Sequence, residues 1–174
     1  SRGIGLALAE GFAVAGANVI ILDINLPAVE GNYNYINCDL GSQDDIRIVL
    51  DRIFSDGFSP KVLINCAAVT IPAPTLQYSA SDWKKSISVN LDGVFAMCRK
   101  VGRKMIEQKN GGSIINFTSI GAEQGFANNP GYAASKGAVK QLTKALAVEW
   151  GEYSVRVNNI VPGYTNTPMN SKSW

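Results

Sequence analysis

Short strand-like runs alternate along this chain with longer helical patterns, and this alternation limits the folds that it can adopt. Residues 3–16 repeat apolar and small side chains at helical spacing, and the run ANVIILD after them predicts a buried strand. Further strands are predicted at 33–38, 61–68, 113–118 and 155–161, and helices at 43–57, 82–108 and 132–152. Parallel strands need helical crossovers, so this order predicts an α/β fold. We expect one domain over residues 1–174, a doubly wound parallel sheet.

Both ends of the chain fall inside elements that such a fold needs. The chain starts at Ser1 within a glycine turn that requires a strand before it, and it stops at Trp174, where a loop over the site should begin. We therefore expect a fragment of a longer chain, with the first strand and the C-terminal segment absent. Residues 1–174 alone would leave a hole in the middle of the sheet, so we expect no cooperative thermal transition from them.

The composition excludes several classes of function. The 174 residues include no histidine, which rules out Ser-His-Asp and Cys-His mechanisms and the common histidine-ligated metal sites, and we expect no metal. The net charge is only +2, which argues against a nucleic-acid surface. No apolar run is long enough to span a bilayer, and the N-terminus lacks a signal-peptide pattern. We expect a cytoplasmic protein that binds neither nucleic acid nor membrane, with Cys38, Cys66 and Cys98 reduced and buried.

The N-terminal residues form a possible nucleotide site. Arg2, Gly3, Ile4 and Gly5 lead directly into a predicted helix. Backbone N–H groups at that helix start would face a pyrophosphate, and glycine would permit its close approach. Two glycines alone are a weak signal, but Asp23 follows at the end of the next strand. That is about the 20-residue distance expected for a carboxylate that binds ribose, so the two features together predict a dinucleotide site.

Asp23 also affects which dinucleotide binds. Its carboxylate can accept hydrogen bonds from both adenosine ribose hydroxyls, whereas a 2′-phosphate would bring two negative charges within a few ångströms of each other. Arg2 argues the other way, because a guanidinium can neutralise that phosphate. We expect NAD as the cofactor, with NADP less favoured.

In the absence of histidine, proton chemistry must come from other side chains. Tyr132 and Lys136 are four residues apart and share one face of a predicted helix. The ordinary explanation of such a pair is an aromatic ring packed on a lysine stem. The functional interpretation is that the ammonium and a cationic nicotinamide lower the tyrosine pKa from about 10 to about 7, which requires roughly 4 kcal/mol. Tyr132 would then exchange a proton with a substrate hydroxyl or carbonyl near neutral pH.

Several motifs in this order resemble the short-chain dehydrogenase/reductase family over nearly the whole chain. They are SRGIG at 1–5, Asp39-Leu40, the run from Asn65 to Ala68, Asn90 within VNLDGVF, Ser119, YAASK at 132–136 and PGYTNT at 162–167. The resemblance implies a Rossmann-like fold. It also implies that the long helices at 90–108 and 132–152 pair with copies of themselves in a dimer or tetramer.

The same resemblance implies a role for each matching residue. Ser119 would hold the reacting oxygen, Tyr132 would be the general acid and base, and Lys136 would bind the nicotinamide ribose and lower the tyrosine pKa. Asn90 would anchor a water molecule of the proton relay. The remaining residues would contact the cofactor: Asp39 and Leu40 at the adenine, Asn65, Ala67 and Ala68 on the adenosine ribose side, and Pro162, Gly163, Thr165 and Thr167 at the nicotinamide amide.

This chain departs from the family pattern at two places. It has Asn65-Cys66-Ala67-Ala68 where Asn-Ala-Gly is usual, which is tolerable if Cys66 packs inward. The connection from Asp23 to Asp39 is short, so the helix usual there should be reduced to a turn.

We therefore expect an oxidoreductase that transfers a hydride reversibly between NAD(H) and a secondary alcohol or ketone. An NADPH-dependent 3-oxoacyl reductase is an alternative that Arg2 favours, and a dinucleotide-binding protein without catalysis is an alternative of another class. The candidate substrate pocket mixes polar and apolar side chains, which slightly favours a sugar or polyol. Its predicted wall consists of Ile71, Pro72, Glu123, Gln124, Phe126, Asn128, Tyr164 and Asn166.

Overall fold

The computed structural model describes residues 1–25 and 31–169, and every predicted helix and strand is present in it. The elements are, in chain order, α1 (Gly3–Val14), β1 (Ile20–Asp23), β2 (Asn34–Asn37), α2 (Gln43–Ser55), β3 (Val62–Asn65), α3 (Ala80–Ile87), α4 (Val94–Glu107), β4 (Gly112–Phe117), α5 (Pro130–Trp150) and β5 (Val155–Ile160). None of the helices in this part of the chain combines the length and the apolar character needed to cross a bilayer. The turn predicted between Asp23 and Asp39 includes residues 26–30, which lie outside the described residues.

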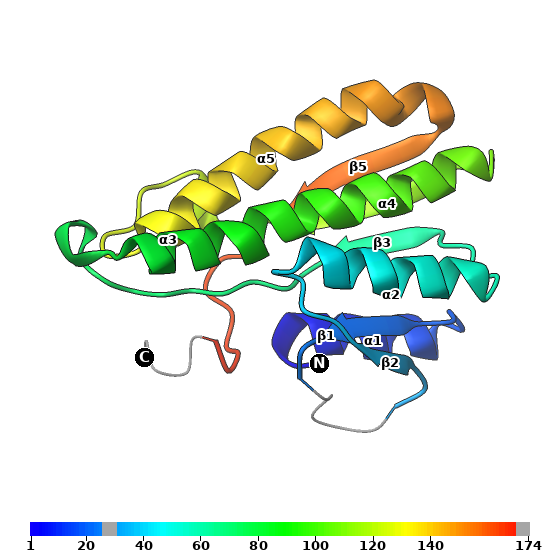
Figure 1. Ribbon diagram of the computed structural model, residues 1–174, viewed down its shortest axis with the longest axis horizontal. Helices are drawn as coiled ribbons and strands as arrows, with labels where there is room; N and C mark the ends of the chain where they lie inside the picture. The colour runs from blue at the N-terminus through cyan, green and yellow to red at the C-terminus, as the bar shows by residue number, and fades with distance from the viewer. Residues whose placement is uncertain (26–30, 170–174) are drawn as a thin grey trace.

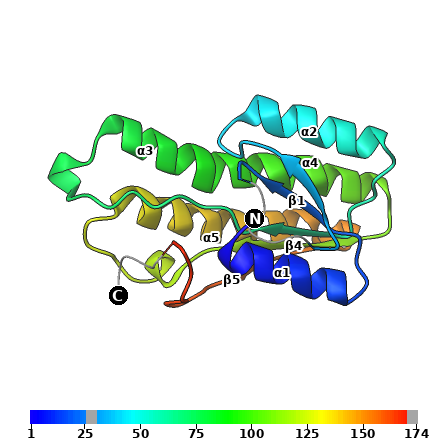
Figure 2. The same cartoon turned by 90° about the horizontal axis from the view of Figure 1, so that it is seen from below.

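All strand pairs in the described residues are parallel, as predicted. One sheet consists of β1 and β2 (Figure 1), and a second sheet has β4 between β3 and β5. The expected hole in the sheet is present, because no backbone pairing joins these two groups of strands within the described residues. Helices α2 and α4 lie on one face and α1 lies on the other (Figure 2), which is the doubly wound arrangement.

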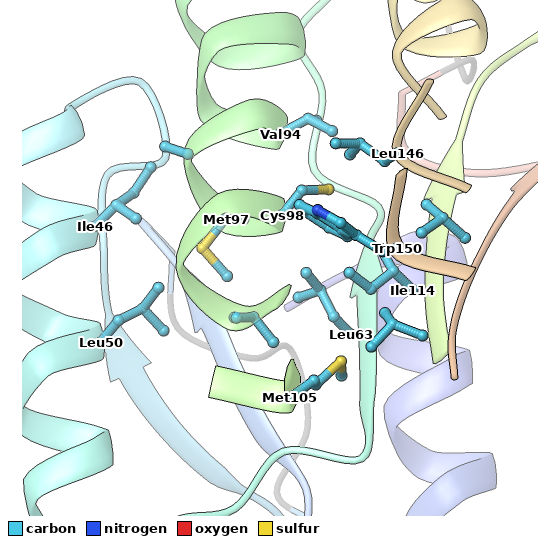
Figure 3. Packing of buried hydrophobic residues seen from close by; sticks show 14 of the residues in the cluster. Ile46, Leu50, Leu63, Val94, Met97, Cys98, Met105, Ile114, Leu146 and Trp150 are labelled. Carbon is cyan, nitrogen blue, oxygen red and sulfur yellow. The ribbon is translucent and has the colours of Figure 1, made fainter. Parts of the chain in front are cut away.

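The main core lies between the three-stranded sheet and helices α4 and α5. Ile114 of β4 and Cys98 and Met105 of α4 are fully buried in this layer, and Trp150 at the end of α5 packs beside them (Figure 3). Complete burial of a large apolar side chain stabilises the fold by about 1.5–3 kcal/mol. This layer therefore holds α5, which carries Tyr132 and Lys136, firmly against the sheet.

The predicted helix at 82–108 is present but not regular. It begins with α3, where the Oγ atom of Ser79 accepts a hydrogen bond of 3.0 Å from the backbone N–H of Asp82. A π-helical segment, Ser88–Gly93, then joins α3 to α4. Such segments occur frequently at functional sites, and this one contains Asn90.

Gly93, the last residue of the π-helical segment, allows the turn at residues 39–41 to approach the helix. A Cβ atom at this position would lie 2.1 Å from the backbone oxygen of Leu40. We expect Gly93→Ala to lower the free energy of unfolding by about 1–3 kcal/mol, because the turn or the helix must move. Urea unfolding of the full-length protein and of this variant measures the change in the free energy of unfolding.

Gly137→Ala in α5 is the matched control for Gly93→Ala. A Cβ atom on Gly137 would meet no neighbouring atom within 4 Å, so the helix propensity of alanine should stabilise the protein by up to about 1 kcal/mol. If the Gly93 variant were as stable as the Gly137 variant, the close approach of Leu40 would be wrong.

Candidate active site

A cleft of about 2360 Å³ is lined by residues of both sheets, and its lining includes residues at or just after the carboxyl ends of the strands, namely Asp23, Cys38, Asn65, Phe117 and Pro162. Ligands of open α/β sheets bind at these ends. The cleft is larger than a small-molecule site needs, so only its carboxyl end is the candidate active site. Ser119, Tyr132 and Lys136 line the cleft. So do all the predicted cofactor residues: Arg2, Gly3, Ile4, Gly5, Asp23, Asp39, Leu40, Asn65, Ala67, Ala68, Pro162, Gly163, Thr165 and Thr167.

The glycine turn has the conformation that an anion site requires. Gly3 has a φ of +55°, a left-handed conformation that suits glycine, and it is the first residue of α1. A Cβ atom on Gly3 would lie 3.4 Å from the Cβ atom of Thr167, so the turn and the segment at 162–167 come together across the cleft. The backbone N–H groups at the start of α1 can therefore face a pyrophosphate.

Asp23 lies at the end of β1 with its carboxylate on the cleft. Its Oδ2 atom accepts a hydrogen bond of 2.7 Å from the Ser1 hydroxyl, and its Oδ1 atom accepts one of 3.0 Å from the backbone N–H of Asn25. Burial raises the pKa of Asp23, but the hydrogen bonds from Asn25 and Ser1 oppose burial and help to bring the pKa below its usual value of 3.8. The carboxylate is therefore ionised at neutral pH, as a ribose-binding group must be.

Lys136 is a buried cation at the centre of the site. Its side chain is only 2% exposed, and its Nζ atom donates a hydrogen bond of 2.6 Å to the backbone oxygen of Phe117. Burial lowers the pKa of Lys136 to about 8, and nearby Cys66 opposes this change. No ion pair in the described part of the chain includes Lys136. A buried lysine without a carboxylate partner is costly to the fold and is typical of a functional site.

Tyr132 lies beside this lysine, with the Nζ atom of Lys136 5.7 Å from the centroid of its ring. Burial raises the pKa of Tyr132 above 10, a hydrogen bond with the Ser119 side chain lowers it only in part, and Cys66 raises it further. The protein's own groups therefore leave the pKa of Tyr132 above its ordinary value, because desolvation of the phenolate outweighs them, and the lowering expected from Lys136 together with a cationic nicotinamide stays a prediction. The prediction relied on two positive charges, and the protein supplies only one of them.

Ser119 follows β4 and completes the group of three. Its Oγ atom accepts a hydrogen bond of 3.1 Å from the backbone N–H of Gly121, at the start of the short helix Ile120–Ala122. The same side chain bonds to Tyr132, so the structure brings Ser119, Tyr132 and Lys136 together. A serine hydroxyl beside a phenol can hold a reacting oxygen between them.

The side chain of Asn90 is bonded within the protein, and its anchoring of a relay water stays a prediction. Its buried side chain clamps the backbone of Val69: Oδ1 accepts from the N–H at 2.8 Å, and Nδ2 donates to the carbonyl at 2.9 Å. Nδ2 also donates to the Ser135 hydroxyl at 3.2 Å, which in turn donates to the backbone oxygen of Tyr132 at 2.7 Å. Both amide hydrogens are used, so the side chain cannot donate to a relay water. It connects the loop after β3 to helix α5.

The side chain of Asn65 is also bonded within the protein, and the place of this residue beside a ribose stays a prediction. Its Nδ2 atom donates to Oδ1 of Asn116 at 2.8 Å and to Sγ of Cys98 at 3.3 Å, both in the interior. Only the backbone of Asn65 remains for a ligand. Cys66, which the sequence suggested only as packing, approaches the glycine turn: a Cβ atom on Gly5 would lie 3.7 Å from its Sγ atom. The place of Cys66 could have been inferred from its position in the sequence between Asn65 and Ala67, two predicted cofactor residues.

Half of the predicted substrate wall lines the cleft. Pro72, Phe126, Asn128 and Tyr164 do so, whereas Ile71, Glu123, Gln124 and Asn166 do not. Glu123 instead pairs with Lys140 of α5 at 2.5 Å. Sequence reasoning missed Thr70 and Asn129, which line the cleft and are joined by a hydrogen bond of 2.7 Å. Asn129 could have been inferred as a cleft residue from its position three residues before Tyr132.

The buried ammonium of Lys136 predicts a pH dependence of stability. Its pKa is about 8 in the folded protein against 10.5 ordinarily, so the unfolded chain binds more protons between these values. The free energy of unfolding should therefore rise with pH through this window. Relative to Lys136→Met, the wild-type protein should gain up to about 3 kcal/mol between pH 7 and pH 10.5. Urea unfolding of both full-length proteins at several pH values measures this, and a constant difference would contradict the burial of a charged lysine.

Comparison with known proteins gives a consistent result. The sequence matches the family model of the short chain dehydrogenases over residues 1–174. It is 33% identical over 184 residues to D-threitol dehydrogenase of Mycolicibacterium smegmatis, and the alignment covers 100% of this chain and 70% of that protein. The fold matches 4-hydroxyisoleucine dehydrogenase complexed with NADH, with a TM-score of 0.92, 34% identity, and 96% and 73% of the two chains covered. It also matches a gluconate 5-dehydrogenase from Burkholderia cenocepacia in complex with NADP and tartrate, with a TM-score of 0.91, 33% identity, and 98% and 71% covered.

Proposed function

This chain belongs to the short chain dehydrogenase family, and on that premise we propose that it transfers a hydride reversibly between NAD(H) and the carbinol carbon of a sugar or polyol. The observation that carries the proposal is the buried ammonium of Lys136 beside Tyr132 and Ser119 in the cleft. A protein that only bound the dinucleotide would have no use for a costly buried cation beside a phenol.

The glycine turn and Asp23 fit a dinucleotide, which when bound supplies the hydride acceptor or donor and a positively charged ring. Ser119 donates a hydrogen bond to the substrate oxygen and orients the carbinol carbon. The phenolate oxygen of Tyr132 takes the hydroxyl proton as the carbon–oxygen double bond forms, and it returns that proton in the reverse direction. The charge of Lys136 favours the phenolate. Asn90 and Ser135 hold the backbone of Tyr132 in place.

The proposal of a sugar or polyol has two supports. D-Threitol dehydrogenase and a gluconate 5-dehydrogenase, both similar to this chain, are named for substrates that carry several hydroxyl groups. The cleft beside Tyr132 includes polar side chains that can bond to such groups, namely Thr70, Asn128, Asn129 and Tyr164.

We propose NAD as the preferred cofactor because the ionised carboxylate of Asp23 would repel a 2′-phosphate. Initial rates with NAD and NADP should show a higher kcat/KM with NAD. Asp23→Ser should change the NAD-to-NADP ratio of kcat/KM by about 10- to 100-fold toward NADP, since the repulsion is lost. Asp51→Asn, which changes an exposed carboxylate in α2, is the control and should keep the ratio.

The substrate class is tested in the same assay with D-threitol, gluconate, a hydroxysteroid and a 3-oxoacyl thioester. Turnover of the polyhydroxylated compounds supports the proposal. Turnover confined to the steroid or the thioester would overturn the sugar or polyol assignment, and a ratio unchanged by Asp23→Ser would overturn the role of that carboxylate.

We further propose that the long helices pair with copies of this chain in a dimer or tetramer. Phe95 on α4 is 41% exposed and Val148 on α5 is 87% exposed, and apolar side chains of this size favour an interface. Sedimentation of the full-length protein tests this, and a monomer at micromolar concentration would contradict it. The cytoplasmic location inferred from the sequence stays a prediction.

A further inference from the structure

A row of asparagines crosses the three-stranded sheet just before its strands end. Asn65, Asn116 and Asn159 stand opposite one another on β3, β4 and β5. Asn65 and Asn116 are buried, and they lie on the same face as Leu63 and Ile114 of the apolar layer in Figure 3. A buried amide costs free energy unless it is hydrogen-bonded, so the partners of these side chains decide what the row does.

The three amides belong to one continuous set of hydrogen bonds, here called the asparagine network, which consists of Asn65, Cys98, Asn116, Thr143 and Asn159. Asn65 donates to Asn116 at 2.8 Å, and Asn116 donates to the Thr143 hydroxyl at 2.8 Å. Asn159 accepts from that hydroxyl at 2.7 Å. The network thus joins all three strands to helix α5 through one hydroxyl.

Thr143 is the central member of this network. Its side chain is 3% exposed, and its Oγ1 atom lies 2.7 Å from Oδ1 of Asn159 and 2.9 Å from the backbone oxygen of Val139. The single hydroxyl proton serves these two acceptors, while the oxygen accepts from Asn116. Asn159 adds a bond of 3.3 Å to the backbone oxygen of Lys140. The network therefore holds the part of α5 that directly follows Lys136.

The same strands lead directly into the active site. Phe117, whose backbone oxygen accepts from Lys136, is the residue after Asn116. The segment that follows is tied to the end of β5 by a bond of 2.9 Å from the Thr118 N–H to the oxygen of Ile160. Lys136 thus reaches β4 one residue beyond the point where Thr143 fastens α5 to that strand. A shift of α5 along the sheet would break both contacts together.

We propose that Thr143 is a positioning residue that fixes α5 on β4 and β5, so that Lys136 stays on the Phe117 carbonyl and beside Tyr132. This inference rests on the proposed function. A residue that only stabilised the fold would change the melting temperature but leave the proton chemistry of the remaining folded protein unchanged.

The test compares Thr143→Val, which replaces the hydroxyl with a methyl group, with Thr143→Ser, which keeps the hydroxyl. Ile114→Val is the control, because it removes a buried methyl group from the same layer without touching the network. Two quantities are measured on the full-length protein: kcat for alcohol oxidation as a function of pH, and the rate at which acetic anhydride labels Lys136, followed by peptide mass spectrometry.

Thr143→Val is expected to lower kcat by about 10- to 100-fold, because displacement of a catalytic group by about 1 Å has an effect of this size. The acidic limb of its pH profile should move to higher pH, since a displaced ammonium favours the phenolate less. Lys136 should be labelled about tenfold faster as its segment opens locally. Thr143→Ser should restore all three properties, and Ile114→Val should leave them as in the wild type.

Unchanged labelling and an unchanged pH profile in folded Thr143→Val would overturn the proposal, as would equal changes in Ile114→Val. If Thr143→Val does not fold, Asn159→Ala removes the hydrogen bond between Thr143 and Asn159 at a less buried residue. The pH profile of kcat and the labelling of Lys136 in that variant then test the proposal. If the wild-type protein oxidises no alcohol, the proposed function fails, whereas the labelling rates still test whether Thr143 holds Lys136 in place.

Discussion

Replacing Tyr132 with phenylalanine is expected to lower kcat for alcohol oxidation by about 10²- to 10⁴-fold, the usual contribution of a general acid or base. The variant keeps the ring that packs beside Lys136 and loses only the hydroxyl that bonds to Ser119. The melting temperature and the affinity for NAD should therefore change little. Steady-state rates, thermal unfolding and a fluorescence titration with NADH measure the three quantities.

Tyr153→Phe is the matched control for this substitution, because Tyr153 is 45% exposed just after the end of α5. It should leave kcat within about twofold of the wild type, as surface changes usually do. If the Tyr132 variant kept most of the wild-type turnover with its fold intact, the proposed proton donor would be wrong.

Lys136→Met is expected to lower kcat by about 10²-fold or more and to raise KM for NAD. The substitution removes the only cation placed beside the Tyr132 ring within the described residues, so the phenolate loses its electrostatic support. It also removes the group proposed to bind the nicotinamide ribose. The methionine side chain should fill most of the same buried volume, so a folded protein is expected.

Lys140→Met provides the comparison, since Lys140 lies one turn further along α5 and pairs with Glu123 near the surface. Steady-state kinetics of both variants with NAD and a polyol decide the point. If the two substitutions had equal effects on kcat, a specific role for the buried ammonium would be contradicted.

The order of strands and helices could be predicted from the sequence because each element has a clear local pattern. The strand at 113–118 and the helix that ends near Trp150 are continuous apolar or amphipathic runs, and the structure places them within a few residues of their predicted ends. The cap of α3 is equally local, as Ser79 precedes Asp82 by three residues. The π-helical segment around Asn90 has no such local signal, because it follows from how the chain packs onto the loop at Val69.

The residues that form the candidate site could be predicted more completely than the role of each residue. Ser119, Tyr132 and Lys136 come together as the spacing and the resemblance suggested. The side chains of Asn65 and Asn90 bond to partners such as Asn116 and Ser135 that are distant in sequence, so no local pattern indicates these hydrogen bonds. Spacing along a chain indicates which residues share an element, but it does not indicate which of their atoms remain free for a ligand.

The pKa of Tyr132 shows the same limit. Lys136 and a cationic nicotinamide together suggested a lowered value, whereas among the protein's own groups burial of the phenol dominates and raises the pKa. The extent of desolvation depends on the whole fold, so it could not be inferred from two residues. This difference also makes the tyrosine a direct probe of the proposed chemistry.

The most direct test is a pH titration of the Tyr132 phenolate by its absorbance, taken as the difference between the wild type and Tyr132→Phe, with and without saturating NAD. Without NAD, the pKa of Tyr132 should lie above its ordinary value of 10, because burial dominates. With NAD bound, the second positive charge should bring it well below 10, toward neutral pH. A pKa that stays above 10 in the complex would contradict the account, because Tyr132 could not then accept a proton from the substrate at neutral pH.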